Sequence, residues 1–187
     1  MAIESDITPR HHDEQRRALQ FSASRILAES DSVSMAAAKV IRMICVRLGW
    51  TAGGMWMLDP NLKQLRLAEL WHHPERDLTE FVKLSRELSF TSGSGLPGLV
   101  WKTGRSQWFR DFVSQQETSS RSASASASEL HGAIGFPIVA RGDTIGVIEL
   151  FSAEMVEPDE TLLQALAGIG NQMGQFIERK AAENGLW

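Results

Sequence analysis

Glu149 is the residue whose position most directly suggests chemistry. It lies in GVIELFS, residues 146–152, a run that is otherwise apolar or neutral. In an extended strand Glu149 shares one face with Val147 and Phe151. Burying a carboxylate there requires a partner or a shifted pKa. Glu149 is therefore a candidate for orienting a bound molecule.

Three other charged residues precede Glu149 and could orient a ligand in the same way, namely Arg110, Asp111 and Arg121. Asp111 is equally suited to capping a turn, and the two arginines to exposure to solvent. Large aromatic residues gather in the same part of the chain, where they more often form core than a ligand cavity. The predicted pocket combines both kinds of side chain: Trp71, Phe90, Trp101, Trp108, Phe109, Asp111, Arg121, His131, Phe136 and Glu149.

Motifs of covalent catalysis and phosphate binding do not appear. The sequence has no G-x-S-x-G elbow, Walker loop or closely spaced Ser/His/Asp set. Gly93, Gly95 and Gly98 spell G-x-G-x-x-G, but the preceding ELSFTS is too polar for a buried parallel strand and Pro97 interrupts the motif. These glycines are better suited to a tight turn into a short helix. We therefore predict a non-catalytic protein.

The single cysteine and the histidines offer little redox or metal chemistry. Cys45 excludes an internal disulfide and a multi-thiolate metal site, and its place beside a helical apolar stripe favours a core thiol. His72 and His73 point to opposite faces of a strand, so we expect no shared metal site. His131 or His72 is the candidate axial ligand in a haem-sensor hypothesis, although a polar residue at a strand end is the simpler interpretation.

Composition and charge argue against nucleic acid and membranes as partners. A net charge of −4 gives no basic stripe for nucleic acid. No apolar run approaches the roughly 20 residues that cross a membrane. The N-terminus carries no charged-plus-apolar targeting signal, which predicts a cytoplasmic location.

Hydrophobic periodicity predicts helices at both ends of the chain and antiparallel strands between them. Residues 1–10 are expected to be disordered and residues 11–183 to form one domain. A helix is predicted over 11–29, a second is opened by Ser32 or Ser34 and ended by Gly49, and a last one follows Asp159.

Two hairpins are predicted between these helices. The first turns at residues 59–61 and the second at residues 141–143, where Gly142 allows a positive φ. The second is apolar on both faces, so we expect it at the sheet centre, covered on both sides. The Ser/Ala-rich segment 113–129 is predicted to be a mobile lid, partly helical around residues 121–130.

The last helix carries apolar residues at alternating steps of four and three, a spacing typical of a coiled-coil seam. Together with residues of the first helix, this seam predicts a parallel homodimer. Its members are Leu19, Ile26, Leu162, Leu166, Ile169, Met173 and Phe176.

Several of these segments together resemble GAF domains of bacterial signalling proteins, including those coupled to histidine kinases. The resemblance runs from about Leu19 to Lys180. It is most specific in GSGLPGLVWKTGRSQWFRDF, in Arg121 with LHGAIGFPI, in GVIELFS and in EPDETLLQALAGIGNQMGQFIERK. It implies an α+β, PAS/GAF-like fold: a six-stranded antiparallel sheet, terminal helices on one face, and a ligand pocket under short helices and loops on the other.

The sequence lacks features of several subgroups of that family, and this limits which cofactors or ligands are expected. Bilin-binding relatives use a pocket cysteine, whereas Cys45 falls in a helix predicted on the other face, so covalent bilin is not expected. The N-K-F-D-E set of the cyclic-nucleotide subgroup is absent. The reductase of free methionine sulfoxide resembles this fold but needs several cysteines. The sequence therefore does not name the ligand.

The resemblance predicts a sensory module that binds a small molecule and signals through its terminal helices to an effector, such as a histidine kinase, in cis or in trans. Two alternatives stay open. One is a structural homodimerisation module whose pocket is filled by its own side chains. The other is a haem or redox sensor.

Overall fold

The protein is built on one antiparallel sheet of six strands. The computed structural model describes residues 4–115 and 120–185. Its strands are β1 (Ala52–Asp59), β2 (Gln64–His72), β3 (Ser89–Phe90), β4 (Gln107–Phe109), β5 (Gly132–Ala140) and β6 (Asp143–Ser152). Their order across the sheet is β3-β2-β1-β6-β5-β4, so the two predicted hairpins lie side by side and the second is central. The predicted six-stranded antiparallel α+β fold is confirmed.

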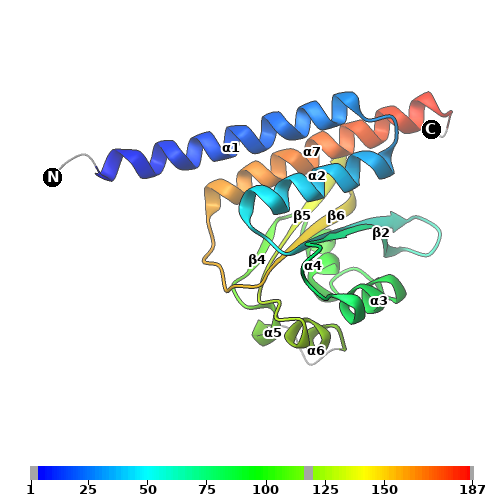
Figure 1. The fold of residues 1–187 in the computed structure, drawn as a ribbon. Coiled ribbons are helices and arrows are strands. Elements are labelled where there is room, and N and C mark those ends of the chain that lie inside the picture. The colour runs from blue at the N-terminus through cyan, green and yellow to red at the C-terminus, as the bar shows by residue number, and fades with distance from the viewer. Residues whose placement is uncertain (1–3, 116–119, 186–187) are drawn as a thin grey trace.

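The helices divide between the two faces of the sheet. They are α1 (Glu4–Glu29), α2 (Val33–Leu48), α3 (Thr79–Glu87), α4 (Gly95–Thr103), α5 (Phe112–Gln115), α6 (Ser120–Ala127) and α7 (Glu160–Glu183). The long helices α1, α2 and α7 cover one face, called here the helix face, and the short helices lie on the other, called here the pocket face (Figure 1).

Strand alternation produces a separate core on each face of the sheet. In β6, Ile148 and Leu150 pack into the core of the helix face. Their neighbours Val147 and Phe151 pack into the core of the pocket face. The sheet is therefore buried on both sides, as the apolar runs of its central hairpin indicate.

Capping residues and a tight turn fix where helices and strands begin and end. The Ser32 hydroxyl accepts a hydrogen bond from the Met35 amide at 3.2 Å and caps α2. Asp159 caps α7 by accepting from the amides of Thr161 at 2.9 Å and Leu162 at 3.2 Å. In the β5–β6 turn, Arg141 and Gly142 both have positive φ, 53° and 82°, which matches the twist of a tight hairpin.

The N-terminal helix begins earlier than predicted. Residues 4–10, expected to be disordered, belong to α1, and residues 1–3 lie outside the described part of the chain. The prediction was wrong because it required an apolar stripe. Once Leu19, Ala23 and Leu27 anchor the C-terminal half of α1 in the core, adding polar turns to an existing helix needs no further nucleus.

The predicted dimer seam is not an open surface. Five of its members are at most 2% exposed within one chain, where α1, α2, α7 and the sheet bury them: Leu19, Leu166, Ile169, Met173 and Phe176. Ile26 and Leu162 are partly buried against the same core. The seam prediction was wrong because steps of four and three also describe a helix that packs on a sheet and on a neighbouring helix.

Helix α7 lies unusually close to strand β5. A Cβ atom at Gly170 would overlap the Pro137 carbonyl oxygen, and one at Gly174 would overlap the Val139 carbonyl oxygen. The helix and strand backbones therefore touch without intervening side chains. A displacement of β5 cannot be absorbed there by side-chain rearrangement.

Candidate functional site

The pocket face has a buried ion pair at its centre. Arg121 extends from α6 to Glu149 in the middle of β6, and their side chains are 4% and 1% exposed. Arg121 Nη1 donates to Glu149 Oε2 at 3.3 Å, and Nη2 donates to Oε1. The pairing is thus bidentate, the strongest geometry for these two groups. Across the sheet Glu149 is opposite Gly54 and Gly135, which have no side chains to crowd it.

Aromatic rings surround the guanidinium group. The Arg121 Cζ atom lies 5.2 Å from the ring centroid of Trp56, 5.1 Å from Phe81, 5.4 Å from Phe90 and 5.3 Å from Phe151. Trp56 also donates its indole N–H to Glu149 Oε1 at 2.8 Å. We call Glu149 and these four rings the aromatic cage. Rings at this distance attract a cation, and the carboxylate neutralises it.

Three buried polar atoms on the short helices α3 and α6 are unsatisfied. Within the described residues, Arg121 Nε, Ser85 Oγ and Ser124 Oγ are buried without a hydrogen-bond partner. Ser124 lies three residues after Arg121 on α6, and Ser85 lies four residues after Phe81 on α3, so each shares a helix face with a group of the site. Helices α3 and α6 pack against each other. Unpaired buried polar atoms are costly, so their presence in this part of the fold needs a physical explanation.

Of the predicted pocket residues, the structure brings Phe90, Arg121 and Glu149 together in this site. Trp101 and Phe109 are partly buried against the same core. Phe109 stacks on Phe112 with ring centroids 6.4 Å apart, and Phe112 in turn meets Phe151 edge to face. Trp101 and Phe109 therefore belong to the surroundings of the cage and not to its walls.

Three predicted pocket residues lie with the other core. Phe136 is fully buried on the helix face, and Trp71 and Trp108 pack against the same core. For Phe136 the reason is alternation: Gly135 is paired with Glu149 and faces the pocket side, so its neighbour points the opposite way. Their assignment to the pocket was wrong.

Asp111 and His131 form a second, more exposed polar pair. His131 Nδ1 lies 3.3 Å from Asp111 Oδ1, with side chains 34% and 19% exposed. Asp111 also accepts a hydrogen bond from the Val113 amide at 3.3 Å, which is the alternative turn-capping role. Arg110 is exposed and paired with Glu157 at 2.6 Å. None of these residues joins the aromatic cage.

Sequence reasoning left out three walls of the cage. Phe151 was recoverable, because strand alternation places it on the face of Glu149. Trp56 lies two residues after Gly54, the strand partner of Glu149, but that register is not visible in the sequence. Phe81 lies in α3, and no motif in the sequence marks it as a site residue. Its contact with Arg121 joins segments forty residues apart and needs the tertiary structure.

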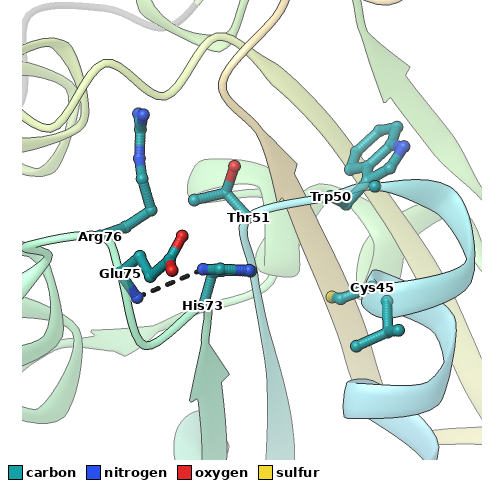
Figure 2. Close-up of a pocket in the computed structure, with 8 residues that line it drawn as sticks. Cys45, Trp50, Thr51, His73, Glu75 and Arg76 are labelled. Carbon is teal, nitrogen blue, oxygen red and sulfur yellow. Dashed lines mark hydrogen bonds between the residues drawn. The ribbon is translucent and has the colours of Figure 1, made fainter.

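A separate cleft of about 420 Å³ lies at the C-terminal end of α2. It is lined by Cys45, Val46, Gly49, Trp50, Thr51, His73, Glu75 and Arg76. Figure 2 shows the Cys45 sulfur pointing from α2 toward His73, whose Nδ1 accepts a hydrogen bond from the Glu75 amide at 3.2 Å. Burial raises the pKa of the Cys45 thiol to about 12, so the nucleophilic thiolate is scarce at neutral pH.

Two further features bear on the class of protein. Among the described residues, no three His, Cys, Asp or Glu side chains are grouped so that they could hold a metal ion. None of the described helices combines the length and apolar character needed to span a bilayer.

A six-stranded antiparallel sheet, with long helices on one face and short helices over a buried polar centre on the other, defines a GAF-type α+β domain. The sequence model of the GAF domain family matches residues 33–178, so the chain belongs to this family. A comparison with curated protein sequences finds no significant match.

Solved structures with this fold come from proteins of different function. The GAF domain of a phosphoenolpyruvate-protein phosphotransferase from Coxiella burnetii has a TM-score of 0.77 at 17% identity, over 92% of this chain and 98% of that one. Free methionine-R-sulfoxide reductase from Neisseria meningitidis, in complex with its substrate, has a TM-score of 0.72 at 19% identity, over 90% and 91%. A domain assigned to a two-component sensor histidine kinase protein from Sinorhizobium meliloti has a TM-score of 0.64 at 17% identity, over 83% and 98%.

Proposed function

We propose that this GAF domain is a non-catalytic, cytoplasmic sensor that binds a small molecule on the pocket face and signals through α1 and α7 to an effector. The buried Arg121–Glu149 pair carries this proposal. An ion pair inside an apolar core rarely adds stability compared with apolar residues of the same size. A binding role explains why it is placed under short helices and not at the surface.

The route of the signal is the contact between the sheet and α7. Glu149 is paired across the sheet with Gly135 of β5, and β5 touches α7 backbone to backbone at Gly170 and Gly174. A ligand that favours one arrangement of the pocket face would therefore bias the position of α7. A histidine kinase, in cis or in trans, is the effector we propose, in keeping with the sensor-kinase domain among the similar structures.

A reductase activity is the enzymatic alternative, since two solved structures of similar fold are methionine sulfoxide reductases. Reduction of a sulfoxide by protein thiols ends in a disulfide or needs a second reductant. This chain has only Cys45, which is buried and whose pKa is about 12. These observations favour binding over turnover.

A parallel homodimer is also part of the proposal, but through a different surface from the predicted seam. Phe21 on α1 is 71% exposed, which is unusual for so large an apolar side chain. We propose that the outward side of α1 around Phe21 forms the contact.

A structural dimerisation module is the second candidate function. One observation favours it: Arg121 itself occupies the aromatic cage, so the chain fills its own site. A ligand screen separates the two functions. A true ligand at about 100 times its Kd should stabilise the fold by roughly 2.7 kcal/mol in thermal unfolding.

The screen needs control variants that show where a ligand binds, and a separate search for a natural ligand. Glu149→Gln should abolish the stabilisation by any ligand of the pocket face, whereas Arg110→Ala, an exposed arginine, should leave it unchanged. Mass spectrometry of molecules released from the purified protein identifies what co-purifies. If no compound in a broad metabolite set stabilises the wild type and nothing is released, the structural function is the better one.

A further inference from the structure

We propose that the aromatic cage is a binding site for an organic cation, such as a quaternary ammonium or alkylguanidinium compound, and that Arg121 is a built-in occupant which the ligand displaces. This inference rests on the proposed function, because it names the chemical class of the molecule sensed on the pocket face. Three features support it: the origin of the cage walls, the charge of the cage and the imperfect fit of its occupant.

The cage and its occupant come from different parts of the chain. Trp56 belongs to β1, Phe90 to β3, Glu149 and Phe151 to β6, and Phe81 to α3. Arg121 alone comes from α6. Withdrawal of Arg121 would leave three of the four rings, Trp56, Phe90 and Phe151, in place on the sheet with Glu149. Helix α3, which carries Phe81, would keep its contact with β2 and lose its contact with α6.

The charge of the cage selects the class of ligand. Glu149 is the acidic group that pairs with the guanidinium, and Trp56 only donates a hydrogen bond to it. Without Arg121 the site would have one buried carboxylate and four π faces, all of which attract a cation and repel an anion. Ring faces around a carboxylate are the chemistry that recognises quaternary ammonium and guanidinium groups.

Arg121 is an imperfect occupant, which makes displacement feasible. Within the described residues its Nε–H has no acceptor, and the hydroxyl groups of Ser85 on α3 and Ser124 on α6 have no partner either. A buried donor without an acceptor weakens the hold of the cage on the group that carries it. A quaternary ammonium ion has no N–H and avoids this cost, whereas a free alkylguanidinium ion keeps the donor but is not tethered to α6.

Displacement would detach α6 from the sheet. The Arg121–Glu149 pair links α6 to β6 at the centre of the pocket face, and Ala125 follows it into the same core one turn later. A cation in the cage and α6 in its present position are therefore alternatives. Binding of the cation then shifts the population of α6 positions.

The wild-type chain can be tested directly by NMR. The probes are choline and ethylguanidinium, and the observable is the indole N–H resonance of Trp56, assigned with Trp56→Phe. The neutral compound 3,3-dimethyl-1-butanol has the shape of choline without its charge, and sodium chloride controls for ionic strength. We expect a saturable shift of the Trp56 resonance with the two cations only.

Substitution of the occupant sharpens the test. Arg121→Ala removes the internal competitor, so cation binding should tighten by about tenfold or more. Adding Glu149→Gln to this variant should abolish binding. Arg110→Ala removes an exposed arginine that is paired with Glu157 outside the cage, and should change the Kd by less than about twofold.

Two results would overturn the cation site: an equal shift with the neutral compound, or no tightening in Arg121→Ala. If Arg121→Ala does not fold, the test rests on the titration of the wild-type chain. The absence of a cation-specific shift at cation concentrations up to about 100 mM then rejects the proposal. Failure of the cation class is distinct from failure of the sensory function. A co-purifying neutral or anionic molecule whose binding requires Glu149 would preserve the sensor while rejecting the cation.

Discussion

The two faces of the sheet are buried to a similar degree but differ in chemistry. On the helix face, the hydrophobic core of α1, α2, α7 and the sheet includes the neutral thiol of Cys45, and the buried unpartnered polar atom of α1, Arg16 Nε, belongs to a partly exposed side chain. On the pocket face, an equally buried core encloses a full ion pair and two unpartnered serine hydroxyls. Apolar packing is what a rigid mechanical contact needs. A polar centre under short helices is what recognition needs.

Under the proposed function, one sheet combines recognition on the pocket face with mechanical coupling on the helix face. Residues of β6 alternate between the faces, so Glu149 belongs to the aromatic cage while Ile148 and Leu150 belong to the core of the helix face. The residues on either side of Glu149 in β6 therefore point to the helix face. Substitutions on each face therefore test whether the two faces differ as described.

Removing one partner of the buried pair should have the largest effect. Glu149→Ala leaves the Arg121 charge buried without its counter-ion, which should lower the free energy of unfolding by about 3–5 kcal/mol. Urea unfolding followed by circular dichroism measures this. The double variant Arg121→Met with Glu149→Met should be near neutral or more stable, because both charges are removed together.

The control for this prediction is an exposed ion pair. Arg25 and Glu29 on α1 are 71% and 64% exposed and 3.1 Å apart. Glu29→Ala should cost less than about 1 kcal/mol, since solvent screens such pairs. If the double methionine variant were as unstable as Glu149→Ala, the pair would be a structural requirement of the fold and the contrast between the faces would be lost.

Crowding the α7–β5 contact should have the next largest effect, this time on the helix face. Gly174→Ala places a Cβ against the Val139 carbonyl oxygen, so it should destabilise the fold by about 1–3 kcal/mol or more. Gly168→Ala in the same helix is the matched control, because its Cβ meets only the end of the Gln20 side chain. That control should be neutral or slightly stabilising, since alanine favours helix.

The comparison of these two glycines tests the signalling route as well as the packing. Thermal or urea unfolding gives both values on one scale. Equal stability of Gly174→Ala and Gly168→Ala would show that α7 can move away from β5 without cost. In that case backbone contact could not transmit a displacement of the sheet.

Much of the helix face was predictable from the sequence, because it depends on local rules. Ser32, Gly49 and Asp159 begin or end helices as their side chains and backbone freedom dictate. The apolar runs of β5 and β6 placed the second hairpin at the sheet centre. Periodicity could not tell which partner the stripe of α7 would meet, and so it predicted a dimer seam where the chain buries its own core.

Phe90, Arg121 and Glu149 were predicted as pocket residues from their types and places in the chain, but the contacts between them were not. Glu149 was found because a charge in an apolar strand is visible in the sequence. Phe136 was misplaced because its face depends on which side of the sheet meets α7. Phe81 and Trp56 join Arg121 from α3 and β1 through contacts that no local pattern encodes. The cage is a product of tertiary folding.

The thiol of Cys45 tests how apolar the helix face is. Burial raises its pKa from 9.0 to about 12. Between these values the unfolded chain loses the proton while the folded chain keeps it, so stability is fully present below about pH 9 and falls as pH rises toward 12. The slope for this group is about 1.4 kcal/mol per pH unit. Cys45→Ala removes this contribution.

The measurement is the difference in unfolding free energy between wild type and Cys45→Ala at about pH 8 and about pH 10, on either side of the unfolded pKa. Other groups titrate in both proteins and cancel in the difference. A difference that does not change with pH would mean that the thiol is solvated in the fold. A fast reaction of the folded wild type with a thiol reagent at the lower pH would lead to the same conclusion.

The exposed side of α1 should give the smallest effect on stability and still be informative. Phe21 is 71% exposed, so Phe21→Ser should change the unfolding free energy by less than about 0.5 kcal/mol. If α1 forms the dimer contact, the same change should raise the dimer dissociation constant, because it removes an apolar anchor from the interface. Val46→Ser on α2 is the control, since Val46 is also exposed, at 60%, but lies on another helix. Sedimentation equilibrium measures the dimer dissociation constant of both variants. A wild type that stays monomeric at high micromolar concentration would contradict the proposed dimer contact on α1.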